Sequence, residues 1–230
     1  MVFMAMTTTD PAPGHRPTPI RLAIIAGYTL VREALEHLLA GCQELDIVAS
    51  GSTPAETIGL VRTRPLDALL LVHTGSVMDE LDIVQRVVAL ERGTRVLVLS
   101  TETSESGALR MLRAGAHGIL APETTTAKVV EALRTLHRGE IYLTKDLQRA
   151  CAERYLGVSP AHSLEDTLTD REYQVMRLLA NGHINREIAK QLGVGVKTID
   201  THRANLLRKL GLRHNVDLTR FAIRQHIINA

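Results

Sequence analysis

Hydrophobic residues in the first part of the chain form short, almost wholly apolar runs, separated by longer segments in which they recur every three or four positions. The short runs predict strands buried on both faces; they are residues 20–26, 45–50, 68–72, 95–100 and 118–120. The longer segments predict helices; they are residues 30–40, 53–63, 78–92, 104–113 and 125–138. Such alternation predicts a doubly wound parallel sheet covered by helices on both faces.

From residue 167 onward the pattern is helical throughout. Residues 169–172 have the spacing of a capping box and open an apolar-periodic segment that Gly182 closes. Further helices are predicted at 185–192, 196–210 and 216–228, with a short glycine-containing turn between the first two. A helix, a tight turn and a second helix form the helix-turn-helix signature, so an all-α four-helix domain is expected.

The helix predicted at 196–210 has two chemically different faces. Its apolar residues, at 196, 199, 206, 207 and 210, gather on one side. The opposite side carries Lys197, Thr201, Asn205 and Arg208, with no carboxylate among them. Polar and cationic groups on an exposed helix face are what entry into a DNA groove requires.

The modest formal net charge of +2 conceals an asymmetry between the two parts of the chain. Residues 167–230 hold 11 Lys and Arg against 5 Asp and Glu, whereas residues 1–166 hold 16 against 20. Only the C-terminal part has the electrostatic character of a polyanion binder. No catalytic or metal-ligand constellation is evident, so we expect neither an enzyme nor a bound metal or cofactor.

Four regions follow from these patterns. Residues 1–19 are rich in Thr and Pro, lack the features of a signal peptide and are predicted to be disordered. Residues 20–139 form the α/β domain, 140–166 form a linker with a short helix over 144–155, and 167–230 form the helical domain. No apolar run approaches the length of a membrane span, and two distant cysteines suit a reducing compartment, so we expect a cytoplasmic protein.

The segment from Leu168 to Ile228 resembles the LuxR-type DNA-binding domain of bacterial transcription regulators. The resemblance is carried by Leu-Thr-Asp-Arg-Glu, Asn-Arg-Glu-Ile-Ala and Lys-Thr-Ile-Asp-Thr-His-Arg, in this order and without a gap. It implies double-stranded DNA as the partner. The candidate phosphate contacts are Arg186, Lys197, Arg208 and Lys209, the candidate base contacts are Thr198, Thr201, His202 and Asn205, and Asn185 is a further candidate contact.

Two positions depart from the more common form of this motif. Asp200 would either repel a phosphate or accept a hydrogen bond from a cytosine amine, and the sequence leaves both open. Gly195 stands where Ser or Thr often caps the helix, so a weaker N-cap is expected.

Residues 20–139 resemble a receiver domain of two-component systems, with a flavodoxin-like (CheY-like) fold. Val-Leu-Val-Leu-Ser and Leu-Arg-Ala-Gly-Ala-His-Gly carry this likeness, and with the second domain it implies a NarL/FixJ-type response regulator. The phosphorylation site, however, is degenerate. Its positions are Ala26, Gly27, Val72, Ser100 and Pro122, of which only Ser100 keeps the residue type that the chemistry uses.

A receiver without these carboxylates and lysine lacks the ligands for Mg²⁺ and the cation for a phosphoryl group, so we expect regulation without phosphorylation. His73 and Tyr28 near the same edge leave open a small-ligand or proton-sensing pocket, against an apolar, plugged former site. The alternatives are a ligand-gated regulator, a conventional phosphorylation-driven regulator, and an antagonist that binds a protein partner at the receiver.

The last predicted helix carries more apolar residues than its own domain needs. Val216, Ile223 and Ile227 form a second stripe beside Leu218 and Phe221. The resemblance implies a homodimer, with this stripe as the contact between DNA-binding domains. Burial of both stripes inside one domain is the alternative.

Overall fold

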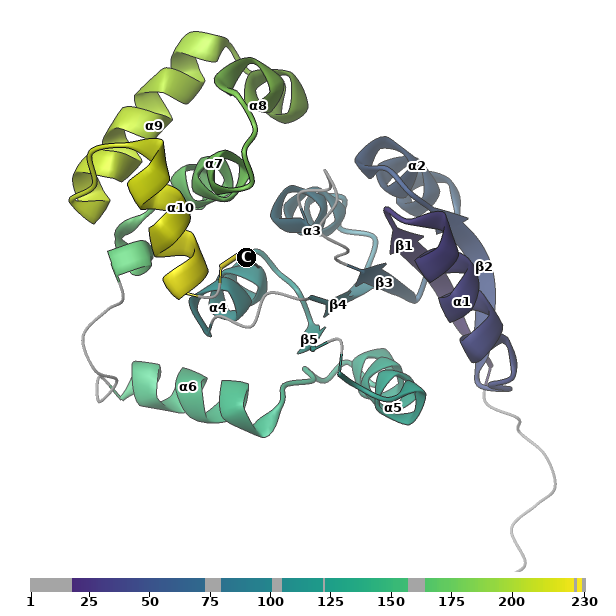
Figure 1. Cartoon of the computed structure of the whole chain (residues 1–230). Helices are drawn as coiled ribbons and strands as arrows, with labels where there is room; N and C mark the ends of the chain where they lie inside the picture. Colours follow the sequence, from purple (N-terminus) through teal and green to yellow (C-terminus); the bar gives the residue numbers. More distant parts are fainter. Residues whose placement is uncertain are drawn as a thin grey trace, which may run out of the picture.

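The computed structural model describes residues 18–72, 80–100, 105–121, 123–156, 164–225 and 227–228 (Figure 1). A five-stranded sheet forms the first domain, from β1 (Ile20–Ala26), β2 (Leu45–Gly51), β3 (Ala68–Val72), β4 (Arg95–Leu99) and β5 (Gly118–Leu120). All neighbouring strands pair in parallel, in the order β2-β1-β3-β4-β5. This order confirms the predicted flavodoxin-like class, because it places the topological switch between β1 and β3.

Helices cover both faces of the sheet because successive side chains in each strand point to opposite sides. These helices are α1 (Thr29–Ala40), α2 (Pro54–Thr63), α3 (Glu80–Ala89), α4 (Glu105–Arg113) and α5 (Thr126–His137). Ala23 and Ile25 pack with α2, α3 and α4, whereas Leu22 and Ile24 pack with α1 and α5. The two cores give the apolar strands partners on both sides.

Local capping chemistry fixes several helix starts. Thr53 accepts a hydrogen bond from the backbone N–H of Glu56, and the Glu56 carboxylate accepts from the N–H of Thr53, which completes a capping box at α2. Thr125 caps α5 and Thr144 caps the linker helix α6 (Lys145–Tyr155) in the same way through their hydroxyls. The linker helix expected over 144–155 is therefore present.

The C-terminal domain begins with the 3₁₀ turn η1 (Leu164–Thr167). Its helices are α7 (Asp170–Ala180), α8 (Asn185–Leu192), α9 (Val196–Leu210) and α10 (Asn215–Arg224). A core of side chains from all four helices includes Met176, Ile188, Ile199, Leu206 and Leu218, each fully or almost fully buried. Figure 1 shows α7 between the receiver helices α3 and α4 and the outward-lying α9.

Two helices end three or four residues earlier than the sequence predicts. Helix α3 ends at Ala89, because Glu91 and Gly93 have positive φ angles of 50° and 74° that a helix cannot continue. Helix α10 ends at Arg224, four residues earlier than predicted. Residues 1–17 and 157–163, which belong to the predicted disordered start and the hinge, lie outside the described residues. None of the described helices is both long and apolar enough to cross a membrane.

Candidate nucleic-acid interface

The turn between α8 and α9 is set by two glycines. Gly193 has φ 65° and ψ 32°, the left-handed conformation in which helices commonly end. Gly195 precedes α9 in an extended conformation and offers no side chain to cap it, as expected. The turn places α8 and α9 in contact, and the buried Ile188 and Ile199 lie in their shared core.

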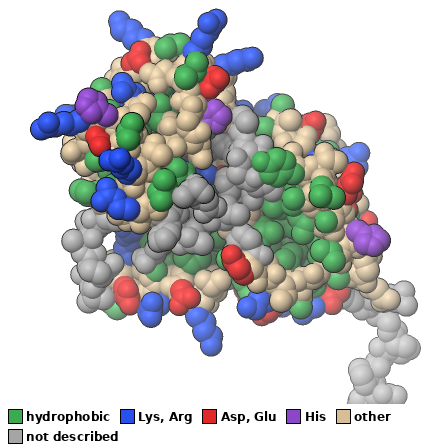
Figure 2. All heavy atoms as spheres, in the orientation of Figure 1, with side chains coloured by type: hydrophobic (Ala, Val, Ile, Leu, Met, Phe, Trp, Pro, Cys, Tyr) green, Lys and Arg blue, Asp and Glu red, His purple; other side chains and the backbone are tan. Residues whose placement is uncertain are grey.

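The outer face of α9 is open to solvent. Lys197, Thr198, Thr201 and Arg208 are exposed, whereas His202 and Asn205 are half-buried. The Thr201 hydroxyl donates to the Lys197 carbonyl at 3.0 Å, and Arg208 donates to the Asn205 amide oxygen at 3.4 Å. Figure 2 shows Lys and Arg side chains projecting from this lobe, away from the receiver. The structure therefore brings these predicted candidates together on one accessible face.

Asp200 has a partner within the helix-turn-helix. The Asn185 side-chain amide donates to the Asp200 carboxylate at 2.6 Å, across 15 residues of chain. This bond joins the first turn of α8 to the first half of α9. The bond is exposed to solvent, and it engages one oxygen of Asp200 with another residue of the same domain. Neither role considered from the sequence included such a partner.

Lys209, predicted as a phosphate contact, is half-buried and pairs with residues of its own domain. Its ammonium group lies 2.6 Å from the Glu172 carboxylate and 3.1 Å from the Thr167 carbonyl oxygen. Burial alone would raise the pKa of Glu172, but the hydrogen bonds from Lys209 and Thr169 outweigh this effect and lower the pKa below its usual value. Lys209 thus ties the end of α9 to the capping box of α7.

The predicted dimer stripe on α10 is only partly exposed. Val216 is 62% exposed and Ile223 is 36% exposed, so both remain available to a partner. Ile227 is 3% exposed and packs in the domain core, so its prediction as a contact residue is wrong. The chain turns back after α10, and the backbone N–H of Ile227 donates to the Ala222 carbonyl at 2.9 Å. The helical periodicity used for the prediction does not extend to residue 227.

At the carboxyl ends of the strands, the described positions of the predicted phosphorylation site carry no carboxylate and no cation. Ala26 and Val72 are buried and pair across β1 and β3, next to Gly27, and Ser100 is buried at the end of β4. Among the residues that the structure describes, no group of three or more His, Cys, Asp or Glu residues could hold a metal ion. Pro122 and His73 lie outside the described residues.

Two carboxylates close to these positions in the sequence, Asp67 and Glu80, have partners elsewhere in the structure. Asp67 accepts from the Arg21 guanidinium at 2.7 and 2.9 Å, at the opposite end of the sheet. Glu80 is 1% exposed and pairs with Arg177 of the helical domain. Neither residue supplies the missing oxygens to the strand ends.

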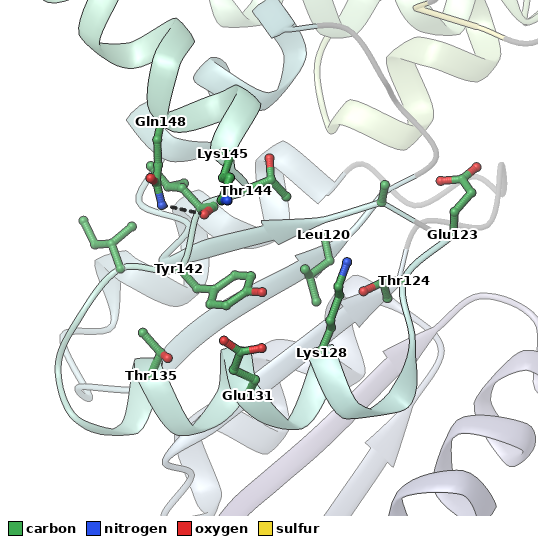
Figure 3. Close-up of a pocket in the computed structure, with 13 residues that line it drawn as sticks. Leu120, Glu123, Thr124, Lys128, Glu131, Thr135, Tyr142, Thr144, Lys145 and Gln148 are labelled. Atoms are coloured by element: carbon green, nitrogen blue, oxygen red, sulfur yellow. Dashed lines mark hydrogen bonds between the residues drawn. The ribbon is translucent and has the colours of Figure 1, made fainter.

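A cavity of about 660 Å³ lies beside this edge rather than in it. Figure 3 shows its lining, with Lys128 and Glu131 from α5 facing Tyr142 and the start of α6. Burial, followed by the nearby Glu131 carboxylate, raises the pKa of Tyr142 above its usual value. The cavity lies between α5 and the linker helix; its lining includes Ala121 and Glu123, on either side of Pro122, but not Ala26, Val72 or Ser100.

The receiver is joined to the helical domain by charged side chains with little solvent access. Arg110 of α4 is 5% exposed; it lies 4.5 Å from the ring centre of Tyr173 and donates to the Leu168 carbonyl and to the Asp170 carboxylate. Arg177 contacts Glu80 of α3 at 3.4 Å. We call these contacts the interdomain clasp. They hold α7 against α3 and α4 and leave the outer face of α9 uncovered.

Sequence reasoning missed the clasp because each partner sits in a different domain. Glu80 and Arg177 are 97 residues apart, and Arg110 and Asp170 are 60 apart. A hint is present in the composition of α3, α4 and α7: charged residues on the buried side of an amphipathic helix are uncommon unless they are paired. Which residues form the pairs is visible only in the folded chain.

Comparisons with known proteins agree with this architecture. Residues 166–222 match the family model of bacterial regulatory proteins of the luxR family. The chain is similar to the transcriptional regulatory protein UhpA of Salmonella typhimurium, at 31% identity over 199 residues that cover 86% of this chain and 95% of the relative. It is also similar to the response regulator UvrY of Escherichia coli, at 24% identity over 92% of this chain and 97% of the relative.

A solved structure shares the arrangement of both domains. RcsB from Salmonella enterica, bound to a promoter in the presence of the phosphomimetic BeF₃⁻, superposes with a TM-score of 0.70 at 18% identity. The match covers 89% of this chain and 98% of that chain. At this level of identity the likeness establishes the fold.

Lys209→Met should destabilise the helical domain without removing a DNA contact. We expect a loss of about 1–3 kcal/mol in the free energy of unfolding, because Glu172 keeps its burial but loses a charged donor. Thermal or urea unfolding measures this loss, and Lys197→Met is the control, since Lys197 is exposed. Equal stability of the two variants would contradict the assignment.

The contribution of the Lys209–Glu172 pair to stability should depend on pH. Because the pKa of Glu172 is lowered in the folded state, its stabilising contribution is present above the unfolded pKa of about 4.3 and is lost as the pH falls through the folded pKa. The unfolding free energy of Lys209→Met should therefore fall less steeply with acidification than that of the unchanged protein.

Removing the clasp should separate the domains. In the double variant Glu80→Gln with Arg110→Ala, we expect the radius of gyration from small-angle X-ray scattering to rise, because two charged contacts and a cation–π contact are lost together. Arg113→Ala on the exposed side of α4 is the control. An unchanged radius in the double variant would show that other contacts hold the domains.

Proposed function

Because the chain belongs to the NarL/FixJ-type response regulators, which are DNA-binding transcription regulators with a luxR-type domain, we propose that it recognises a specific DNA sequence through α9 as a dimer. We also propose that its receiver works without phosphorylation. The observation that carries the proposal is the contrast between two surfaces. The outer face of α9 is cationic and accessible, whereas the strand ends that would hold phosphate present Ala26 and Val72.

DNA recognition divides between two kinds of contact. Lys197, Arg186 and Arg208 are exposed cations suited to phosphate oxygens, which position the domain without reading sequence. Asn205 and Thr201 lie on the outer face of α9, where an amide or hydroxyl can pair with base edges in the major groove. Thr198 and His202 lie on the adjoining turns and extend the same surface, and Asn185 contributes at its edge.

The coordination chemistry of Mg²⁺ supports a receiver that works without phosphorylation. Mg²⁺ requires hard oxygen ligands in near-octahedral geometry, and phosphoryl transfer to a receiver needs an oxygen nucleophile and charge neutralisation. Ala26, Gly27 and Val72 provide none of these, and Pro122 replaces the cation. The nearest described carboxylate of α2, Glu56, is occupied by Ser52 and Thr53, which together lower its pKa.

Dimerisation supplies affinity that one recognition helix lacks. A single helix reaches only a few base pairs, and two half-sites about one helical turn apart double the contacts. Val216 and Ile223 on α10 form the exposed apolar surface that such a dimer needs. Its formation does not depend on a phosphoryl group.

Ligand gating is a second candidate, favoured by the cavity between α5 and α6 (Figure 3). Its lining includes the linker helix that leads to the DNA-binding domain, so an occupant would contact both parts. This differs from the ligand site considered at the degenerate phosphorylation edge, and it leaves the proposal for α9 unchanged.

Asn205→Ala should cost about 1–3 kcal/mol in binding to the preferred operator and should relax specificity, because a bidentate amide reads one base pair. Lys197→Ala should weaken specific and random duplexes alike and reduce the log–log salt slope by about 1. Fluorescence anisotropy on both duplexes at several salt concentrations measures the difference. Equal losses on both duplexes for Asn205→Ala would remove this residue from base reading.

Acetyl phosphate or BeF₃⁻ with Mg²⁺ should leave DNA affinity unchanged, and Val72→Asp should not create a response. A single restored carboxylate faces Ala26 and Gly27, which contribute no metal ligand, so Mg²⁺ would bind weakly. Operator affinity with and without the phosphodonor is the measurement. A tenfold gain, about 1.4 kcal/mol, in the unmodified protein would overturn phosphorylation independence.

A further inference from the structure

The amino ends of three adjacent strands bring charged residues together at the edge opposite to the degenerate phosphorylation site. Ala68 at the start of β3 pairs with Leu22 of β1 and with Arg95 of β4. Arg21 and Asp67 directly precede the paired residues. Backbone hydrogen bonds from Asp67 to Arg21 and from Arg95 to Asp67, both 2.9 Å, fix this arrangement.

A cavity of about 450 Å³ opens at this edge. Its lining contains four arginines, Arg21, Arg64, Arg92 and Arg95, together with His137 and a single carboxylate, that of Asp67. These residues come from the start of β1, the turns before β3 and β4, the start of β4 and the end of α5. Four separate segments of the chain thus contribute to one concave, cationic site.

Within the part of the chain that the structure describes, a carboxylate pairs with only one of the four guanidinium groups. Arg21 uses both carboxylate oxygens of Asp67, at 2.7 and 2.9 Å, and it lowers the pKa of that carboxyl by hydrogen bonding. Arg64 donates to the Val48 carbonyl and Arg92 donates to the Arg62 carbonyl at 3.0 Å. Carbonyl oxygens accept these bonds but carry no net charge, so the positive charge of both groups remains.

Arg95 has the guanidinium with the fewest partners among the four arginines of the cavity. Its guanidinium makes no hydrogen bond or ion pair with any residue in the described part of the chain, and its charge lowers the pKa of His117, an effect second to burial. Three guanidiniums without a carboxylate share one small cavity. Like charges at close range repel each other in the absence of a counter-ion.

The charge is not a property of the domain as a whole. Residues 1–166 hold 16 Lys and Arg against 20 Asp and Glu, so this cationic cavity lies in a net acidic region. It is also removed from the outer face of α9, which belongs to the other domain. The concentration of arginine here requires an explanation separate from DNA binding.

We propose that this cavity binds a small, multiply charged phosphate-class anion, either an inorganic polyphosphate or the polyphosphate group of a nucleotide. The planar guanidinium fork matches phosphate oxygens in a bidentate geometry that a point charge does not provide. A volume of about 450 Å³ falls within the range of small-molecule sites. Such a ligand would give the receiver an input that does not use its degenerate edge.

Isothermal titration of the full chain with sodium pyrophosphate and with ATP, without Mg²⁺ and at constant ionic strength, tests the proposal. We expect saturable binding that is weakened at least about tenfold in Arg64→Gln with Arg95→Gln, because two charge-assisted contacts are lost. Arg149→Gln on α6 is the matched control, since its side chain is 73% exposed and lies outside the cavity lining. Binding to the control should be unchanged.

The two probes separate the sources of the phosphate. Tighter binding of ATP than of pyrophosphate assigns the cavity to a nucleotide, and equal binding assigns it to the polyphosphate group alone; both support the proposal. A rise in melting temperature with ligand concentration provides a second readout. If the double variant does not fold, Arg95→Gln alone replaces it, because this guanidinium supports no described contact.

Three results would overturn the proposal. These are the absence of saturation by either probe at millimolar concentration, equal affinity in the cavity variant and in the Arg149→Gln control, and equal binding of sulfate at the same ionic strength. A loss of operator affinity in the cavity variant without any effect on pyrophosphate binding would also overturn the proposal, and it would indicate that the cavity contacts DNA. Operator binding that is intact in the cavity variant leaves the function proposed for α9 untouched.

Discussion

Helix α7 packs against its own domain on one side and against the receiver on the other, and the arrangement of the domains depends on this constraint. Its capping box at Thr169 and Glu172 is tied to Lys209 at the end of α9, while Asp170 and Arg177 on the receiver side meet α4 and α3. Because the receiver covers one side of α7, the side of the DNA-binding domain that faces away from the receiver is the one open to solvent. That side carries the outer face of α9.

The elements and most of their ends followed from the sequence because their causes are local. Capping hydroxyls, left-handed glycines and apolar periodicity act within a few residues, and they placed α8 and α9 correctly. The ion pair of Lys209 and the burial of Ile227 did not follow from the sequence, for a different reason. Periodicity assigns a residue to a helix face but does not identify a partner 37 residues away or the point at which α10 stops.

The strand ends at Ala26 and Val72 show that this fold forms with apolar residues at positions where the resemblance to receivers places carboxylates. Ala26 and Val72 bury apolar surface where a working receiver would expose carboxylates, so this substitution exchanges a desolvation cost for packing. The hydrophobic sheet needs no phosphoryl group to be stable. The receiver is docked on α7 through side chains such as Arg110 and Glu80.

Electrostatics favours the same arrangement over a longer range. The region up to residue 166 is net acidic and the helical domain is net basic. The opposite net charges therefore attract the two domains to each other, in addition to the contacts of the interdomain clasp. DNA phosphates attract the helical domain from the side of α9, away from the receiver. At physiological ionic strength, salt largely screens exposed charges that are more than about 8 Å apart, whereas the interactions of the buried Glu80 and Arg110 are screened much less. Salt should therefore weaken contacts with DNA more than contacts between the domains.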